Sequence, residues 1–132
     1  MERYERLFEN LTADCALITS DVNRRYFTGM KSSAGIVIAF PEKMYLLIDF
    51  RYIEKARATV RNAEVIELIN TGKQLLEIIN KHNVHTMAIE SETMTVKALS
   101  SYRHILNGIT IDDSDSLSNA INHLRTIKDD EE

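Results

Sequence analysis

Residues 35–49 read GIVIAFPEKMYLLID and carry the strongest structural signal in the chain. Two apolar runs, 35–40 and 44–49, flank a short Pro-Glu-Lys segment. Pro41 fixes its own φ angle and has no N–H to donate to a strand ladder, so it marks a turn between two strands. Both runs are apolar at successive positions, which is typical of strands covered by helices on both faces. The segment therefore predicts an antiparallel hairpin within a three-layer α/β/α sandwich.

Helices and strands alternate along the rest of the chain. Apolar residues recur every three or four positions in five segments, which predicts helices over residues 2–11, 51–61, 72–82, 95–106 and from 116 onward. Short apolar runs predict further strands over residues 16–19, 64–69, 86–90 and 109–112. Asn83 and Gly108 suit the ends of two of these helices. The pattern indicates one α/β domain, residues 1–127, with a mixed sheet of roughly five or six strands.

Composition and charge exclude several classes of function. Of the 132 residues, 44% are hydrophobic, 27% are charged and one is proline, a balance typical of an ordered globular domain. Sixteen basic and twenty acidic residues give a net charge of −4, which disfavours a nucleic-acid binder. There is no apolar signal core and no run long enough to span a bilayer, so we expect a cytoplasmic protein without membrane contact. The single cysteine, Cys15, lies in an apolar stretch and is expected to be a buried structural thiol.

Asp49, Arg51 and Tyr52 stand where the second strand of the hairpin runs into a helix. Asp49 is a candidate helix cap, because its carboxylate can accept the unpaired N–H groups of the first helical turn. The Arg51 guanidinium is suited to binding a carboxylate, and Tyr52 has a phenol on an apolar body. Together they could recognise a peptide terminus or fix a neighbouring loop, and the structural role is favoured.

Residues 26–29, Tyr-Phe-Thr-Gly, place two aromatic rings before a small residue and a glycine. Glycine permits a sharp backbone turn, so we expect a loop here, after a turn or helix start at Asp21. One ring could project toward a partner, or Tyr26 and Phe27 could both fill core space. Composition alone does not separate these two interpretations.

No residue pattern indicates a metal site or an activated nucleophile. His82 and His85 are three residues apart across a predicted helix end, without a cysteine or carboxylate cluster to complete a tetrahedral set. The acids at 112–115 lack the glycine and the closing glutamate of a calcium loop. The chain also lacks a G-x-S-x-G elbow and a phosphate-binding glycine loop.

Five short motifs occur in an order that resembles the N-terminal domain of the creatinase, prolidase and aminopeptidase P family. They are Asn23 with Tyr26-Phe27-Thr28-Gly29, then Ser33-Ala34-Gly35, Asp49-x-Arg51-Tyr52, Ile89-Glu90 and Leu124-Arg125-x-Ile127-Lys128. Met30 departs from the aromatic residue that is usual in the family after the glycine. The resemblance covers nearly the whole chain and implies the creatinase N-terminal, ribonuclease H-like fold.

The resemblance implies that a metal-dependent catalytic domain follows, with residues 128–132 as the start of the linker to it. In such proteins the metal ligands, which are acidic residues and a histidine, all lie in that following domain. We therefore expect no catalytic residue and no metal ligand in this chain. The longer parent protein would use a pair of Mn²⁺, Co²⁺ or Zn²⁺ ions to hydrolyse peptides with proline in second position. The present chain alone is expected to be folded but inactive.

The resemblance also implies a role for this domain within the parent. It would help to form a homodimer and would bring the segment from Tyr26 to Met30 toward the active site of the partner subunit, where it limits substrate length. Tyr26 or Phe27 would pack at that interface, while Asp49 and Arg51 hold the local geometry. The alternatives are a peptide- or protein-binding module without catalysis and a creatinase-type amidinohydrolase.

Overall fold

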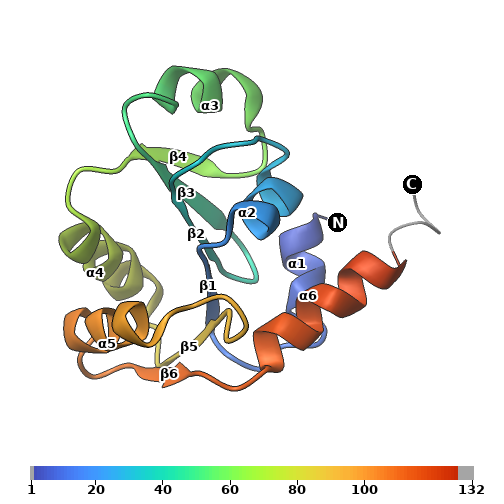
Figure 1. The fold of residues 1–132 in the computed structure, drawn as a ribbon, viewed down its shortest axis with the longest axis vertical. Coiled ribbons are helices and arrows are strands. Elements are labelled where there is room, and N and C mark those ends of the chain that lie inside the picture. The colour runs from blue at the N-terminus through green and yellow to red at the C-terminus, as the bar shows by residue number, and fades with distance from the viewer. Residues whose placement is uncertain (1, 128–132) are drawn as a thin grey trace.

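The computed structural model describes residues 2–127, and residues 128–132, the expected linker, lie outside this range. The helices are α1 (Arg3–Leu7), α2 (Asp21–Thr28), α3 (Ile53–Thr59), α4 (Thr71–His82), α5 (Val96–Ile105) and α6 (Ser116–Ile127). The strands are β1 (Cys15–Ile18), β2 (Ile36–Ala39), β3 (Met44–Ile48), β4 (Glu64–Glu67), β5 (Thr86–Ile89) and β6 (Thr110–Asp112). Figure 1 shows the alternation of helices and strands that confirms the α/β class.

The strands form one six-stranded sheet in the order β4-β3-β2-β1-β5-β6. β2 and β3 form the predicted antiparallel hairpin, in which Val37 pairs with Leu46 and Ala39 with Met44. β2 is also antiparallel to β1, whereas β1 with β5, β5 with β6, and β3 with β4 are parallel pairs. The sheet is therefore mixed, as predicted, and β2 is the strand that runs against the others.

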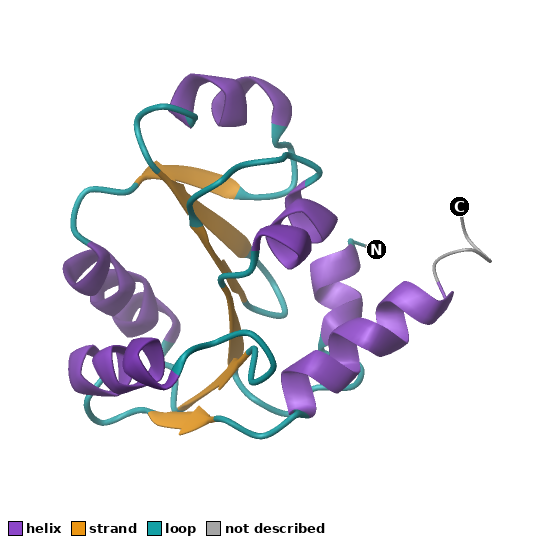
Figure 2. Ribbon diagram, in the orientation of Figure 1, coloured by secondary structure: helices purple, strands orange, loops and turns teal. Residues whose placement is uncertain are grey.

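Helices cover both faces of the sheet, which gives the predicted three layers (Figure 2). Residues of α1, α2, α3 and α6 form an apolar cluster on one face, and those of α4 and α5 join a second cluster on the other. Within β1, Ala16 and Ile18 belong to the first cluster, whereas Cys15 and Leu17 belong to the second. Both faces of the strand are buried, and each fully buried aliphatic side chain contributes about 1.5–3 kcal/mol relative to exposure. This arrangement explains why the strands are apolar at successive positions.

Capping residues determine where the helices begin and end. The Ser20 hydroxyl accepts a hydrogen bond from the Asn23 N–H at 3.3 Å and so begins α2. α2 continues through Thr28 and ends at Gly29, which has a φ of 78°. The prediction of a loop over residues 26–29 was therefore wrong, because the glycine ends a helix instead of shaping a turn between strands. Asn83, with a φ of 56°, ends α4 as predicted.

The first helix is shorter than predicted. α1 ends at Leu7, where the chain turns and the Phe8 N–H donates to the Glu5 carbonyl at 3.2 Å. Leu11 is still buried in the same cluster as Leu7. The apolar spacing over residues 2–11 therefore reflects the burial of a turn as well as of a helix. Every other predicted helix and strand begins and ends within two residues of the observed bounds.

Candidate functional site

Five strands have their carboxyl ends at the same edge of the sheet, because they run in one direction; they are β1, β3, β4, β5 and β6. We call this the carboxyl edge. It carries the residues that follow these strands, including 19–21, 49–52 and Glu90. The residues that lead into β2 join it, because β2 runs the opposite way. Ligands of open α/β sheets bind beyond the carboxyl ends of the strands, so this edge is the first place to look for a site.

Glu90 directly follows β5 and is a buried carboxylate, with 2% of its surface exposed. Its Oε1 accepts hydrogen bonds from the backbone N–H groups of Thr19 and Ser20 at 2.6 and 2.9 Å. Its Oε2 accepts from the Ser20 hydroxyl at 2.6 Å and from the Asn23 side-chain amide at 2.7 Å. These four donors compensate the loss of hydration of the carboxylate and tie β5 to the connection between β1 and α2.

Arg125 extends this network to α6. Its Nη1 donates to Oδ1 of Asn23 at 2.9 Å, and its guanidinium lies 5.2 Å from the centroid of the Tyr26 ring. Arg3 of α1 lies 4.4 Å from the same ring centroid and donates from Nη1 to the Tyr26 carbonyl at 2.7 Å. The Tyr26 ring is thus contacted by two guanidinium groups, which fix α1, α2 and α6 relative to one another.

Three of the sequence motifs meet in this network, namely those of Asn23, Glu90 and Arg125. Sequence reasoning assigned no role to these residues. The one signal that could have pointed to Glu90 is its position, because an acidic residue that directly ends an apolar strand must find hydrogen-bond donors when it is buried.

Asp49, Arg51 and Tyr52 lie together at the carboxyl edge, as the sequence predicted. Asp49 accepts hydrogen bonds from the Arg51 backbone N–H at 3.0 Å and from Nη2 of Arg51 at 2.7 Å, and these lower the pKa of Asp49. The prediction that Asp49 caps the helix was wrong, because the residue before α3 is Tyr52. The Tyr52 hydroxyl lies 2.7 Å from the Ser33 hydroxyl. Of these contacts, the one between Tyr52 and Ser33 joins the segment to the loop before β2.

Arg24 is the buried cation of this edge, with 3% of its surface exposed. Its guanidinium contacts the Thr19 carbonyl and the Asp21 carboxylate, and Nη2 donates to the Ser32 carbonyl at 2.9 Å. Among residues 2–127 its Nε has no hydrogen-bond partner. The sequence did not point to this residue, since an arginine within a polar helix is normally exposed.

Gly35 lies against Arg24 and lets the loop before β2 approach the sheet closely. Its φ is 141°, a value that favours glycine. A Cβ at this position would lie 3.2 Å from the Leu47 carbonyl oxygen and 3.5 Å from Nε of Arg24. Arg24 and Gly35 therefore set the path of residues 30–35 together.

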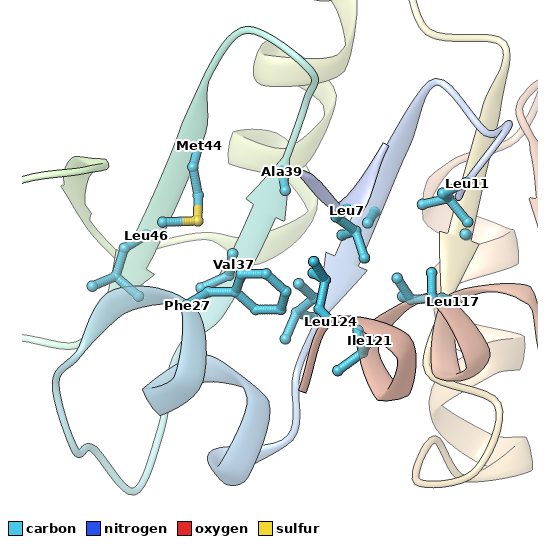
Figure 3. Packing of buried hydrophobic residues seen from close by; sticks show 14 of the residues in the cluster. Leu7, Leu11, Phe27, Val37, Ala39, Met44, Leu46, Leu117, Ile121 and Leu124 are labelled. Carbon is cyan, nitrogen blue, oxygen red and sulfur yellow. The ribbon is translucent and has the colours of Figure 1, made fainter. Parts of the chain in front are cut away.

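Two of the five residues from Tyr26 to Met30 are buried. Phe27 is 2% exposed and Met30 is 4% exposed, and both belong to the first apolar cluster. Figure 3 shows Phe27 in the same layer as Val37 of β2. The Thr28 hydroxyl donates to the Arg24 carbonyl at 2.8 Å. The Phe27 ring fills core space, and the half-buried Tyr26 packs against the same cluster, whereas one interpretation of the sequence had both rings in the core.

Large apolar side chains are exposed at the carboxyl edge, among them those that follow β3 and β4. Phe50 is 73% exposed and Ile69 is 80% exposed. In the parallel ladder of β3 and β4, Ile48 pairs with Glu67. Phe50 follows Ile48 by two positions, and Ile69 follows Glu67 by two positions. Sequence reasoning named the polar neighbours of Phe50 but neither of these residues. Exposed apolar side chains that cluster are typical of contact surfaces between proteins or domains.

Two clefts lie on the face that carries α2 and α3. The first, of about 520 Å³, is lined by the last residues of both helices, including Tyr26, Thr28 and Asn62 beyond α3. The second, of about 420 Å³, is lined by the first residues of both helices, including Val22 and Tyr52. The candidate residues 26–30 and 49–52 are thus associated with opposite ends of α2 and α3, and the structure does not bring them into one site.

His82 and Cys15, which the sequence also singled out, have structural roles. Nε2 of His82 lies 2.7 Å from the Tyr45 hydroxyl, and the imidazole stacks on Phe40 with the ring centroids 3.8 Å apart. Cys15 is buried, as predicted, and burial raises its pKa to about 12. Within residues 2–127, no three His, Cys, Asp or Glu side chains are grouped so that they could hold a metal ion. None of the helices described is both long and apolar enough to cross a membrane.

Comparisons with known proteins agree with this fold. The sequence profile of the family described as "Creatinase/Prolidase N-terminal domain" matches residues 1–127. The peptidase YqhT of Bacillus subtilis is 32% identical over 136 residues, covering 100% of this chain and 37% of that protein. A putative Xaa-Pro aminopeptidase of Mycoplasma pneumoniae is 34% identical over 90 residues, covering 68% of this chain and 25% of that protein. The chain thus spans about a third of the length of these curated relatives or less.

Solved structures show the same fold. An Xaa-Pro dipeptidase from Bacillus anthracis has a TM-score of 0.82 at 21% identity, and the match covers 93% of this chain and 35% of that chain. The N-terminal domain of the cytoplasmic peptidase PepQ from Mycobacterium tuberculosis has a TM-score of 0.73 at 24% identity, covering 89% of this chain and 97% of that chain. The profile match, which spans every residue described, shows that this chain belongs to the creatinase/prolidase N-terminal domain family.

Proposed function

We propose that this chain is the non-catalytic N-terminal domain of a metal-dependent Xaa-Pro peptidase, either a dipeptidase or an aminopeptidase P. The family match over residues 1–127 carries the proposal. The partial coverage of the relatives supports it, because 37% of one relative and 25% of another leave room for a catalytic domain. The name of the PepQ structure, a cytoplasmic peptidase, supports a cytoplasmic location.

The metal ions of the parent would be a pair of Mn²⁺, Co²⁺ or Zn²⁺ ions held by the missing catalytic domain. The residues described here do not fit such a centre. No three potential ligands are grouped within residues 2–127, and several of the residues that the sequence singled out have structural partners. Asp113 pairs with Arg103 at 2.8 Å, and Asp115 accepts from the Ser91 hydroxyl at 2.7 Å. The domain would therefore contribute shape and contacts, and no metal ligand.

The contribution of this domain would be dimerisation and a wall that limits substrate length at the active site of the partner subunit. The burial of Phe27 and Met30 moves the expected contact away from their side chains. The exposed Phe50 and Ile69, beside the fixed Asp49–Arg51 pair, support a contact surface at the carboxyl edge. Tyr26 and Thr28 remain candidates for the wall, since both line the larger cleft.

The experiment uses the full-length parent protein with Mn²⁺, an Ala-Pro dipeptide and an Ala-Pro-Ala tripeptide. Hydrolysis of either peptide supports the peptidase, and hydrolysis of neither overturns it. Absence of turnover with retained peptide binding would instead point to a binding module, and hydrolysis of creatine would point to an amidinohydrolase.

A second experiment tests the proposed role of this domain in dimerisation and substrate selection by the parent protein. The double variant Phe50→Ser/Ile69→Ser removes the exposed apolar side chains, and Leu76→Ser on α4 is the matched control, because Leu76 is also exposed but lies on the other face. We expect the double variant to weaken dimerisation at least tenfold or to shift the ratio of tripeptide to dipeptide hydrolysis, with the control unchanged. If sedimentation and kinetics match those of the control, this role of the carboxyl edge is wrong.

A further inference from the structure

The smaller cleft is separate from the hydrogen-bond network of Glu90. It lies at the carboxyl edge, has a volume of about 420 Å³ and is open to solvent between the first turns of α2 and α3. Its lining includes Val22, Arg25, Lys31, Ser33, Tyr52 and Lys55. A cleft of this size is within the range of small-ligand sites, which combine apolar walls with a few charged groups.

The lining has an excess of positive charge on a chain whose net charge is −4. Arg25, Lys31 and Lys55 are exposed, and none of them forms an ion pair with another residue in the described part of the chain. The one carboxylate in the lining, Asp21, is already paired with the buried guanidinium of Arg24. A cleft lined by one sign of charge concentrates ligands of the opposite sign.

The wall of this cleft is held in place by contacts that do not use these three cations. Arg24 donates to the Ser32 carbonyl at 2.9 Å, and the Tyr52 hydroxyl lies 2.7 Å from the Ser33 hydroxyl. The first contact joins the loop before β2 to α2, and the second joins it to the residue that precedes α3, so the cleft is formed before a ligand arrives. Preorganisation of this kind lowers the entropic cost of binding.

We propose that this cleft binds the C-terminal carboxylate of a short peptide. Arg25, Lys31 and Lys55 attract the carboxylate, and Val22 with the Tyr52 ring contacts the last side chain of the peptide. Val22 is 62% exposed, and this apolar wall beside the cations matches a carboxylate that is attached to an amino-acid side chain. The inference rests on the proposed function, because it assigns a subsite for the peptides that the parent protein would hydrolyse.

The test measures binding to the 132-residue chain, separately from catalysis. The PepQ N-terminal domain, of which this chain covers 97%, was solved as a separate domain, which supports the use of this chain alone. The tripeptide Ala-Pro-Ala and its C-terminal amide are titrated while backbone amide signals are followed by NMR. Because exposed ion pairs are individually weak, we expect a dissociation constant in the region of about 1 mM.

We expect saturable shifts at Ser33 and Tyr52 with the free acid and at least fivefold weaker binding of the amide. The double variant Lys31→Glu/Lys55→Glu is expected to weaken binding of the acid at least tenfold. Lys73→Glu is the matched charge control, because Lys73 is also exposed but begins α4 on the other face of the sheet. Binding of the acid by this control should equal that of the unmodified chain.

Three results would overturn the proposal: equal binding of acid and amide, equal behaviour of the double variant and the control, or binding of inorganic phosphate as tight as that of the peptide. The last result would indicate general attraction of anions. These failures are distinguishable from failure of the proposed function, which depends on turnover by the full-length protein and not on this titration.

Discussion

Replacing Glu90 by glutamine is expected to destabilise the domain strongly, although the two side chains have nearly the same shape. The carboxylate accepts four hydrogen bonds at 2.6 to 2.9 Å, two from backbone N–H groups and two from the side chains of Ser20 and Asn23. The carbonyl oxygen of a glutamine can still accept the two backbone donors. Its NH₂ group then faces the Asn23 amide, which is itself a donor here, so one charged hydrogen bond is lost and a donor is left buried without a partner.

The magnitude follows from these losses. A hydrogen bond to a charged group contributes about 1.5–3 kcal/mol, and an unsatisfied buried donor costs about 1–3 kcal/mol. Because the Ser20 hydroxyl can rotate and the site can relax, we expect Glu90→Gln to lower the free energy of unfolding by about 2–4 kcal/mol. That is a large fraction of the roughly 5–15 kcal/mol typical of a whole domain.

The assay is urea unfolding at pH 7, followed by circular dichroism, of the unmodified chain, Glu90→Gln and the control Glu92→Gln. Glu92 is exposed two residues further along the chain, so its replacement should change the free energy of unfolding by less than about 0.5 kcal/mol. The variants Asn23→Ala and Asn23→Ala/Glu90→Gln complete a double-mutant cycle, in which contact predicts a coupling of about 0.5–3 kcal/mol. A Glu90→Gln variant as stable as the control would show that this network does not stabilise the fold.

The other predictions concern single positions. Gly35→Ala should lower the free energy of unfolding by about 2–3 kcal/mol, because the new Cβ would meet the Leu47 carbonyl at 3.2 Å in addition to the backbone strain. Gly29→Ala, where a Cβ meets nothing within 4 Å, should cost only about 1 kcal/mol, and equal urea midpoints for the two variants would contradict this. Because burial raises the pKa of Cys15 to about 12, its thiol should not react with Ellman's reagent at pH 8 until urea unfolds the chain, and rapid reaction of the folded chain would show that it is accessible. Hydrogen bonds from the backbone N–H groups of His85 and Thr86 lower the pKa of Asp14, so its stabilising effect should be present above about pH 4 and lost as the pH falls through the folded pKa. Asp14→Asn should therefore lower the urea midpoint at pH 6 more than at pH 3, and an equal loss at both would rule out this origin.

Much of the fold could be predicted because its signals are local. The hairpin follows from two apolar runs around Pro41, and the layers follow from strands that are apolar on both faces. The helix over residues 21–28 could not be predicted in the same way. Its buried face combines Phe27 with the charged Arg24, so the apolar periodicity that marks a helix is incomplete.

The candidate site shows the same difference between contacts of sequence neighbours and contacts of distant residues. The contacts among Asp49, Arg51 and the following turn join neighbours in sequence, and residue types alone pointed to them. The network around Glu90 joins residues far apart, with Asn23 and Arg125 separated by 102 positions. Nothing in a single sequence specifies such pairs, because only the order of the strands brings them together.

The decisive comparison is between the purified 132-residue chain and the longer parent protein proposed above, each incubated with Mn²⁺ and an Ala-Pro dipeptide. Release of proline is measured against a control that contains the metal alone. We expect release by the parent and none above the control by the chain. Metal-dependent release by the chain itself would contradict the claim that this domain is a scaffold without catalytic groups.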